Sequence, residues 1–144
     1  MGILPDEIKP AMQGVIPSHV VTCSRDGTPN ASAISQVYYV DADHVALSHQ
    51  FFNKTKRNIE ENPRAAVWVI SPETFEAWDL ELEFVRSETS GPVFEVMEMQ
   101  IEAIASIVGM KGIFKLRAAD IFRVTAATKA VGERIPLTEI RAPR

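Results

Sequence analysis

Four short apolar runs separated by turn signals occupy the chain between residues 16 and 70. They are IPSHVVTCS (16–24), NASAISQVYYV (30–40), HVALSH (44–49) and RAAVWVI (64–70). RDGTP follows the first run, and Asp-Gly is typical of a tight β-hairpin. With the acidic turn DAD before the third run, the first three predict a three-stranded meander.

In the second half of the chain, the spacing of the apolar residues changes from one segment to the next. DLELEFVRSE (79–88) alternates apolar with mostly acidic residues, which predicts a strand with one solvent-exposed face. Over residues 92–108 the apolar residues instead share one helical stripe, and Pro92 suits the first turn of a helix. The last strand is expected within 112–127, with a bulge at residues 118–120.

The order of these segments predicts a mostly β fold. Short helices are expected at residues 5–13 and between Asn53 and Asn62. Roughly six antiparallel strands with one long and one or two short helices favour a small closed or split β-barrel, because closure removes sheet edges. We expect a single domain over residues 1–144, with a barrel core at about 10–127 and a tail at 128–144.

Composition excludes several classes of protein. The formal net charge of −4 disfavours a general nucleic-acid binder, which needs a basic face. No apolar run approaches the roughly 20 residues of a membrane span, and the first ten residues do not resemble a signal peptide. Cys23 is the only cysteine, so no internal disulfide is possible. We expect a cytoplasmic protein that binds neither nucleic acid nor membrane.

A basic cluster stands out in this acidic chain. Lys54, Lys56 and Arg57 lie within four positions, at the start of the expected short helix. A helix N-terminus favours anions, so Lys54, Thr55 and Lys56 are a candidate site for one phosphate. The alternative is a solvated helix face, on which the cations pair with the glutamates of the next turn.

No catalytic motif accompanies this cluster. The three histidines lack metal-ligand spacing, and no metal site is expected. His49 precedes the cations and is a candidate ligand contact or acid–base group, with a purely structural histidine as the alternative. The sequence contains no G-x-S-x-G, G-x-G-x-x-G or Walker A pattern.

The stretch TCSRDGTPNASAISQVYYVDADHVALSHQFFNKTKRNIEENPRAAVWV (22–69) resembles a known family. It combines a strand, an Asp-Gly-x-Pro hairpin, a long strand, an acidic turn, a short strand, a basic segment and N-I-E-E-N-P before the next strand. This order is similar to that of the pyridoxamine 5'-phosphate oxidase-like, FMN-binding split barrels. The resemblance covers about residues 10–127.

The resemblance implies a homodimer with FMN in a groove between the subunits. The implied cofactor-binding residues are Ala33, Ile34, Ser35 and Gln36 along the isoalloxazine ring, Ser48 and His49 near the phosphate and ribityl chain, and Lys54, Thr55 and Lys56 at the phosphate.

The resemblance also implies the chemistry, because in such proteins the flavin carries the electrons and the protein binds and orients it. The expected function is an FMN-dependent oxidoreductase that acts on a small molecule, and no catalytic side chain is implied. No Lys or Arg lies between Arg25 and Lys54, and no histidine follows His49, so this chain departs from the vitamin B6 oxidase pattern and pyridoxamine phosphate is not the expected substrate. The alternatives are a non-catalytic module that binds or senses flavin, deazaflavin or haem, and a small RNA-binding barrel.

Overall fold

One antiparallel sheet carries the fold in the computed structural model, which describes residues 2–50 and 54–130. Its seven strands are β1 (Ser18–Cys23), β2 (Pro29–Ile34), β3 (Val37–Asp41), β4 (His44–His49), β5 (Arg64–Ile70), β6 (Ala77–Glu88) and β7 (Ala118–Ala130). The helices are the 3-10 helix η1 (Asp6–Ala11), α1 (Lys54–Glu61) and α2 (Pro92–Ile107). The expected mostly β class, with roughly six strands, one long helix and one or two short helices, is confirmed, and the structure has seven strands and two short helices in the described residues.

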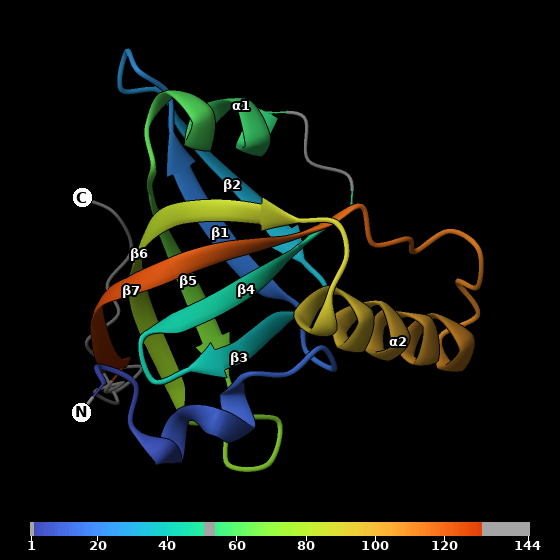
Figure 1. Cartoon of the computed structure of the whole chain (residues 1–144). Coiled ribbons are helices and arrows are strands. Elements are labelled where there is room, and N and C mark those ends of the chain that lie inside the picture. The colour runs from blue at the N-terminus through green and yellow to red at the C-terminus, as the bar shows by residue number, and fades with distance from the viewer. Residues whose placement is uncertain (1, 51–53, 131–144) are drawn as a thin grey trace, which may run out of the picture.

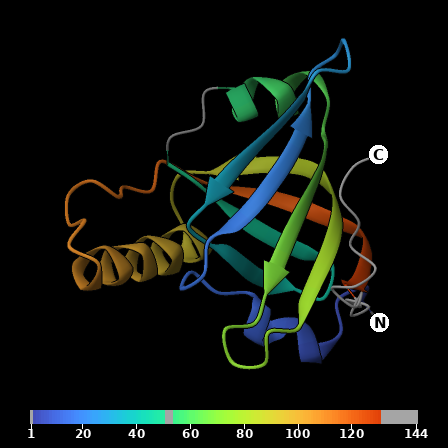
Figure 2. The same ribbon diagram turned by 180° about the vertical axis from the view of Figure 1, so that it is seen from behind.

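The sheet curls around a core but its hydrogen-bonded ladder does not close. Neighbouring strands follow the order β2-β1-β5-β6-β7-β4-β3, so β2 and β3 are the two ends of the ladder in the described residues. α1 lies over one end of the curved sheet, and η1 lies at the opposite end (Figures 1 and 2). α2 lies beside the sheet, near β3 and β4 (Figure 1).

Alternate residues of the strands enter two hydrophobic clusters. Val45 and Leu47 of β4 join the core inside the curl, whereas Ala46 between them packs with the cluster beneath α2. The buried face of α2 consists of Met97, Ile101 and Ala105, in agreement with the predicted stripe. No helix in residues 2–50 and 54–130 is both long and apolar enough to cross a membrane.

The expected long strand over residues 30–40 is broken at Ser35-Gln36, and the expected meander is wrong. β2 pairs with β1, while β3 pairs with β4 at the other end of the ladder. The backbone N–H of Gln36 donates to the Ser48 hydroxyl at 3.1 Å, and the N–H of Ser48 donates to the Gln36 carbonyl at 3.2 Å. These two bonds fix the chain at the point where it passes from β2, at one end of the ladder, to β3, at the other end.

The expected bulge at residues 118–120 is also wrong, because Ala118–Arg123 pair residue by residue with β4. The irregularities lie in the pairing of β6 with β7, between Glu81 and Leu82 and between Phe84 and Arg86. β7 begins at Ala118 and not at residue 112, and it extends to Ala130, three residues beyond the expected end. The expected tail at 128–144 thus begins inside β7, and its part from 131 onwards lies outside the described residues.

The predicted Asp-Gly hairpin joins β1 to β2. Gly27 has φ +90°, a conformation that side chains disfavour. The Asp26 carboxylate accepts hydrogen bonds from the hydroxyl groups of Ser24 and Thr28 and from the Thr28 N–H. These bonds, with that of Ser24 the largest contribution, lower the pKa of Asp26 to about 2.

Ser48→Ala tests the bonds that hold the strand break. The change leaves the buried N–H of Gln36 without its acceptor, and we expect the free energy of unfolding to fall by about 1–3 kcal/mol. Urea denaturation of the ligand-free protein measures this loss. Ser106→Ala is the control, because Ser106 is exposed and its hydroxyl bonds only within α2. Equal stability of the two variants would contradict the role of Ser48.

Candidate functional site

A cavity of about 700 Å³ lies beside β2 and is the candidate functional site. β2 is the last strand at its end of the described ladder, so only the edge that faces β1 is paired. Residues 32–35 line the cavity, together with Ser48 from β4 and Gln50 directly after it. An edge strand presents unpaired backbone N–H and C=O groups. Both backbone and side-chain hydrogen-bonding groups therefore border the cavity.

Four of the residues that line the cavity are polar, namely Ser32, Ser35, Ser48 and Gln50. The Ser35 hydroxyl donates to Oε1 of Gln50 at 3.1 Å, while Ser48 is engaged with the backbone of Gln36. Ser48 is 1% exposed and Gln50 is 4% exposed, so the protein itself positions both side chains.

Most of the apolar lining residues come from two segments far apart in sequence. They are Val15 and Pro17 before β1, Ile104 of α2, and Val108, Met110 and Phe114 after it. Gly14 allows the segments to approach, because a Cβ there would lie 2.7 Å from Cδ1 of Ile104 and 2.9 Å from the Ser35 carbonyl oxygen. A cavity of this volume, lined by apolar residues and a few fixed polar groups, suits an organic ligand.

The first turn of α1 adjoins the cavity through Ser32. The Thr55 hydroxyl lies 3.1 Å from the Ser32 hydroxyl and accepts a hydrogen bond of 3.1 Å from the amide of Asn30. Lys54 precedes Thr55 at the start of the helix and is exposed. An N-terminal turn with a cation beside a ligand-sized cavity can hold the anionic group of a bound molecule.

Lys56 points to a different part of the fold. Its ammonium group lies 3.3 Å from Oδ1 of Asp120, donates to the Ser87 hydroxyl and lies 5.0 Å from the ring centre of Phe84. The Asp120 side chain is only 3% exposed, and Nδ1 of His49 lies 3.8 Å from its Oδ2. Asp120 thus joins Lys56 of α1 to His49 of β4, and we call Lys56, His49, Ser87 and Asp120 the Asp120 cluster.

The nine predicted cofactor-binding residues fall into three groups. Ala33, Ile34, Ser35 and Ser48 line the cavity. Gln36 and Thr55 are each one hydrogen bond from a lining residue, and Lys54 is exposed at the start of α1. His49 and Lys56 belong to the Asp120 cluster.

Reasoning from the sequence missed two residues of this region. Gln50 follows the predicted Ser48-His49 pair directly, so its position was the available signal. Asp120 lies 64 positions after Lys56, and no local pattern connects the two. The alternative to a phosphate site was that the cations of α1 pair with the glutamates of the next turn, such as Lys56 with Glu60. Lys56 instead forms its ion pair with Asp120, which is more buried.

The histidines are separate from one another. His19 is exposed on β1, and Nδ1 of His44 lies 2.9 Å from Oδ1 of Asp41 in the turn between β3 and β4. Within the described ranges, no three His, Cys, Asp or Glu residues are grouped so that they could hold a metal ion.

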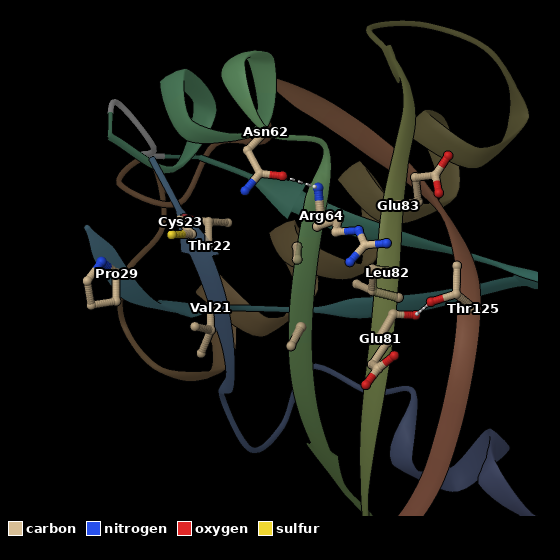
Figure 3. Close-up of a pocket in the computed structure, with 12 residues that line it drawn as sticks. Val21, Thr22, Cys23, Pro29, Asn62, Arg64, Glu81, Leu82, Glu83 and Thr125 are labelled. Atoms are coloured by element: carbon tan, nitrogen blue, oxygen red, sulfur yellow. Dashed lines mark hydrogen bonds between the residues drawn. The ribbon is translucent and has the colours of Figure 1, made fainter. Parts of the chain in front are cut away.

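A second hollow of about 520 Å³ lies over strands β1, β5, β6 and β7 (Figure 3). Figure 3 shows Cys23 at one side, Arg64 in the middle and Glu83 at the other side. Thr125 donates a hydrogen bond to the Glu81 carbonyl at 3.2 Å at its border. None of the nine predicted residues lines this hollow, so we assign the candidate site to the cavity beside β2.

Lys56→Ala and Lys54→Ala test whether Lys56, which contacts Asp120, stabilises the fold more than the exposed Lys54 does. Without Lys56 the buried Asp120 loses a charged partner, and we expect the unfolding free energy to fall by about 1–3 kcal/mol. Lys54→Ala should change it by less than about 0.5 kcal/mol, because Lys54 is exposed. Urea denaturation without ligand measures both values. Equal values would show that the contact with Asp120 does not stabilise the fold.

Solved structures of low sequence identity share this fold. An FMN-binding protein from Syntrophomonas wolfei subsp. wolfei superposes with a TM-score of 0.70 and 15% identity, covering 89% of each chain. An F420 reductase gives a TM-score of 0.59 with 18% identity, over 87% of this chain and 98% of that one. HutZ, the haem storage protein from Vibrio cholerae, gives 0.56 with 16% identity, over 92% of this chain and 98% of that one. The predicted split-barrel class is confirmed.

Sequence comparison identifies the family. The uncharacterized protein MJ0282 of Methanocaldococcus jannaschii is 40% identical over 50 residues, which are 33% of this chain and 34% of that protein. The matched segment thus spans about a third of the length of that relative. The family model of pyridoxamine 5'-phosphate oxidase matches residues 4–128, which is most of the chain. The chain therefore belongs to the pyridoxamine 5'-phosphate oxidase family.

Proposed function

We propose that the cavity beside β2 binds FMN and that the protein is an oxidoreductase acting on a small molecule. The observation that carries the proposal is the cavity of about 700 Å³ along the unpaired edge of β2, with the first turn of α1 next to it. Four of the residues that the family resemblance implies, Ala33, Ile34, Ser35 and Ser48, line this one cavity. Bound flavin would supply the redox chemistry, and this chain would bind and orient it.

The apolar and the polar lining residues fit the faces and the rim of a flavin ring. Ile104, Val108 and Phe114 offer apolar contacts to the plane of a ring system. Ser35 and Gln50, with the backbone of β2, offer hydrogen bonds to its polar rim. The ring would thereby be held in one orientation and shielded from water on its apolar side.

The phosphate would lie at the start of α1. Lys54 is exposed there, and the backbone N–H groups of a first helical turn favour a negative charge. Lys56 would have to leave Asp120 to reach the same anion, so we assign the main charge contact to Lys54. Thr55 is held by Asn30 and Ser32 and positions this turn against β2.

A homodimer is part of the proposal. Val15 and Val108 line the cavity and are 73% and 56% exposed, and Ile107, next to Val108 in the chain, is 84% exposed. Exposed apolar side chains beside a cavity suit an interaction site. A second copy of the chain would cover these residues and close the cavity.

A deazaflavin or haem is the second candidate ligand. It is favoured by the shared fold of the F420 reductase and of the haem storage protein. Titration of the wild type with FMN and riboflavin tests the first candidate, and titration with haem and a deazaflavin tests the second.

Lys54→Ala should weaken FMN binding by roughly 10- to 100-fold, the loss expected for one hydrogen-bonded charge contact. Riboflavin, which lacks the phosphate, should lose less than about twofold. Fluorescence titration of both ligands measures the two affinities, and a flavin absorbance band after desalting shows retention. The melting temperature of the wild type should rise with FMN concentration by mass action.

Equal losses for FMN and riboflavin would contradict the phosphate assignment. A wild-type protein that takes up neither flavin would contradict the proposed function as a whole, and titration with haem and a deazaflavin would then test the second candidate.

Ile107→Asp tests the dimer. A charge at this exposed apolar position should dissociate the dimer and weaken FMN binding together, because the partner closes the cavity. Phe75→Asp is the control, since Phe75 is 71% exposed in the loop between β5 and β6. Sedimentation velocity measures both masses. A wild-type protein that sediments as a monomer with FMN bound would contradict the dimer.

A further inference from the structure

We propose that Gln50 determines which ligands the cavity accepts, by donating a hydrogen bond from Nε2 to an acceptor atom of a planar ring. The inference rests on the proposed function and deepens it. It adds a residue that the family resemblance does not imply, and it names the chemical property that this residue recognises.

The side-chain amide of Gln50 is buried at the cavity. Gln50 lines the cavity and is 4% exposed. Its Oε1 accepts a hydrogen bond from the Ser35 hydroxyl at 3.1 Å. Its Nε2 is buried and has no hydrogen-bond partner among residues 2–50 and 54–130. The amide is therefore anchored at one end and unsatisfied at the other, beside a cavity large enough for an organic ligand.

The unpaired N–H group of Gln50 has an energetic cost. A buried N–H group without an acceptor lowers stability, so buried amides are normally paired. Gln13 shows the normal case in this chain: its Nε2 donates to the carbonyls of Ile16 and Ile70, and its Oε1 accepts from backbone N–H groups. Gln50 differs because the residue lines a cavity while its Nε2 lacks an acceptor, so a ligand that enters beside the side chain can complete the pairing.

The free group of Gln50 determines which ligand atom it can bind. Because Ser35 holds Oε1, the group that remains is a donor, and it matches a carbonyl oxygen or an unprotonated ring nitrogen. The rim of an isoalloxazine ring carries such acceptors. A ring that presents an N–H group at this point would leave two donors unpaired, and a ring with only C–H groups there would leave the amide unpaired. Both disfavour binding relative to a ring with an acceptor.

The test compares Gln50→Met with Gln13→Met in the full chain. Gln50→Met keeps the length of the side chain and removes the amide, so the melting temperature of the ligand-free protein should stay unchanged or rise. Gln13→Met removes an amide whose groups are satisfied, and its melting temperature should fall. A fall of the same size in both variants would make Gln50 a structural residue and overturn the proposal.

Ligand binding gives the second readout, with FMN, riboflavin and lumiflavin, which is the ring without the ribityl chain. Gln50→Met should weaken all three by the same factor, about 3- to 10-fold, because the lost bond is to the ring. Gln50→Glu should weaken them further, since a carboxylate offers no donor. Unchanged affinities, or a loss for FMN alone, would overturn the proposal while the proposed function stands. A wild type that binds none of the three would overturn both.

Discussion

The two hydrogen bonds between Gln36 and Ser48 are the constraint on which the geometry of the site depends. They bind the point where the chain leaves β2 to the end of β4, so that β2 and β3 enter opposite ends of the ladder. A continuous strand through Ser35 would not separate the two edges in this way. The break leaves one edge of β2 unpaired, and the cavity lies along that edge.

The two ends of the curved sheet differ in chemistry. At the η1 end the contacts are apolar, since Leu4, Ile8 and Ala11 pack into the core. At the α1 end Ile59 also enters the core, but polar groups meet beside it. Asn58 donates to Thr22 at 3.1 Å, Thr55 contacts β2, and Lys56 contacts Asp120. Buried polar groups that are paired with one another fix the position of a helix more specifically than apolar packing does. α1 is therefore held in one place relative to the cavity.

Local features of the fold could be predicted from the sequence, and features set by distant contacts could not. The Asp26-Gly27 hairpin, the alternation in β6 and the stripe of α2 are properties of a few consecutive residues, and all three are confirmed. The break at Ser35-Gln36 depends on Ser48, and the bulges depend on the register of β6 against β7. In both cases the interacting residues lie too far apart in the sequence for a local pattern to connect them.

The candidate site follows the same division. The family resemblance implied Ala33–Ser35 and Ser48, because the family pattern matches these positions along the chain, and the structure brings them to one cavity. It could not place the ammonium group of Lys56, since Asp120 reaches it only through the pairing of β7 with β4. It also did not include Gln50, whose unsatisfied amide is visible only in three dimensions.

The Asp120 cluster also affects the selectivity of the anion site that we propose at the start of α1. Of the three cations of α1, Lys56 is neutralised by Asp120, and Lys54 and Arg57 remain exposed. Two exposed cations in water attract a small anion only weakly, because solvent and salt screen them. Inorganic phosphate would gain little there. A phosphate attached to a group that fills the adjoining cavity would be held at a high effective concentration, so the site would discriminate an organic phosphate from the free ions of its surroundings.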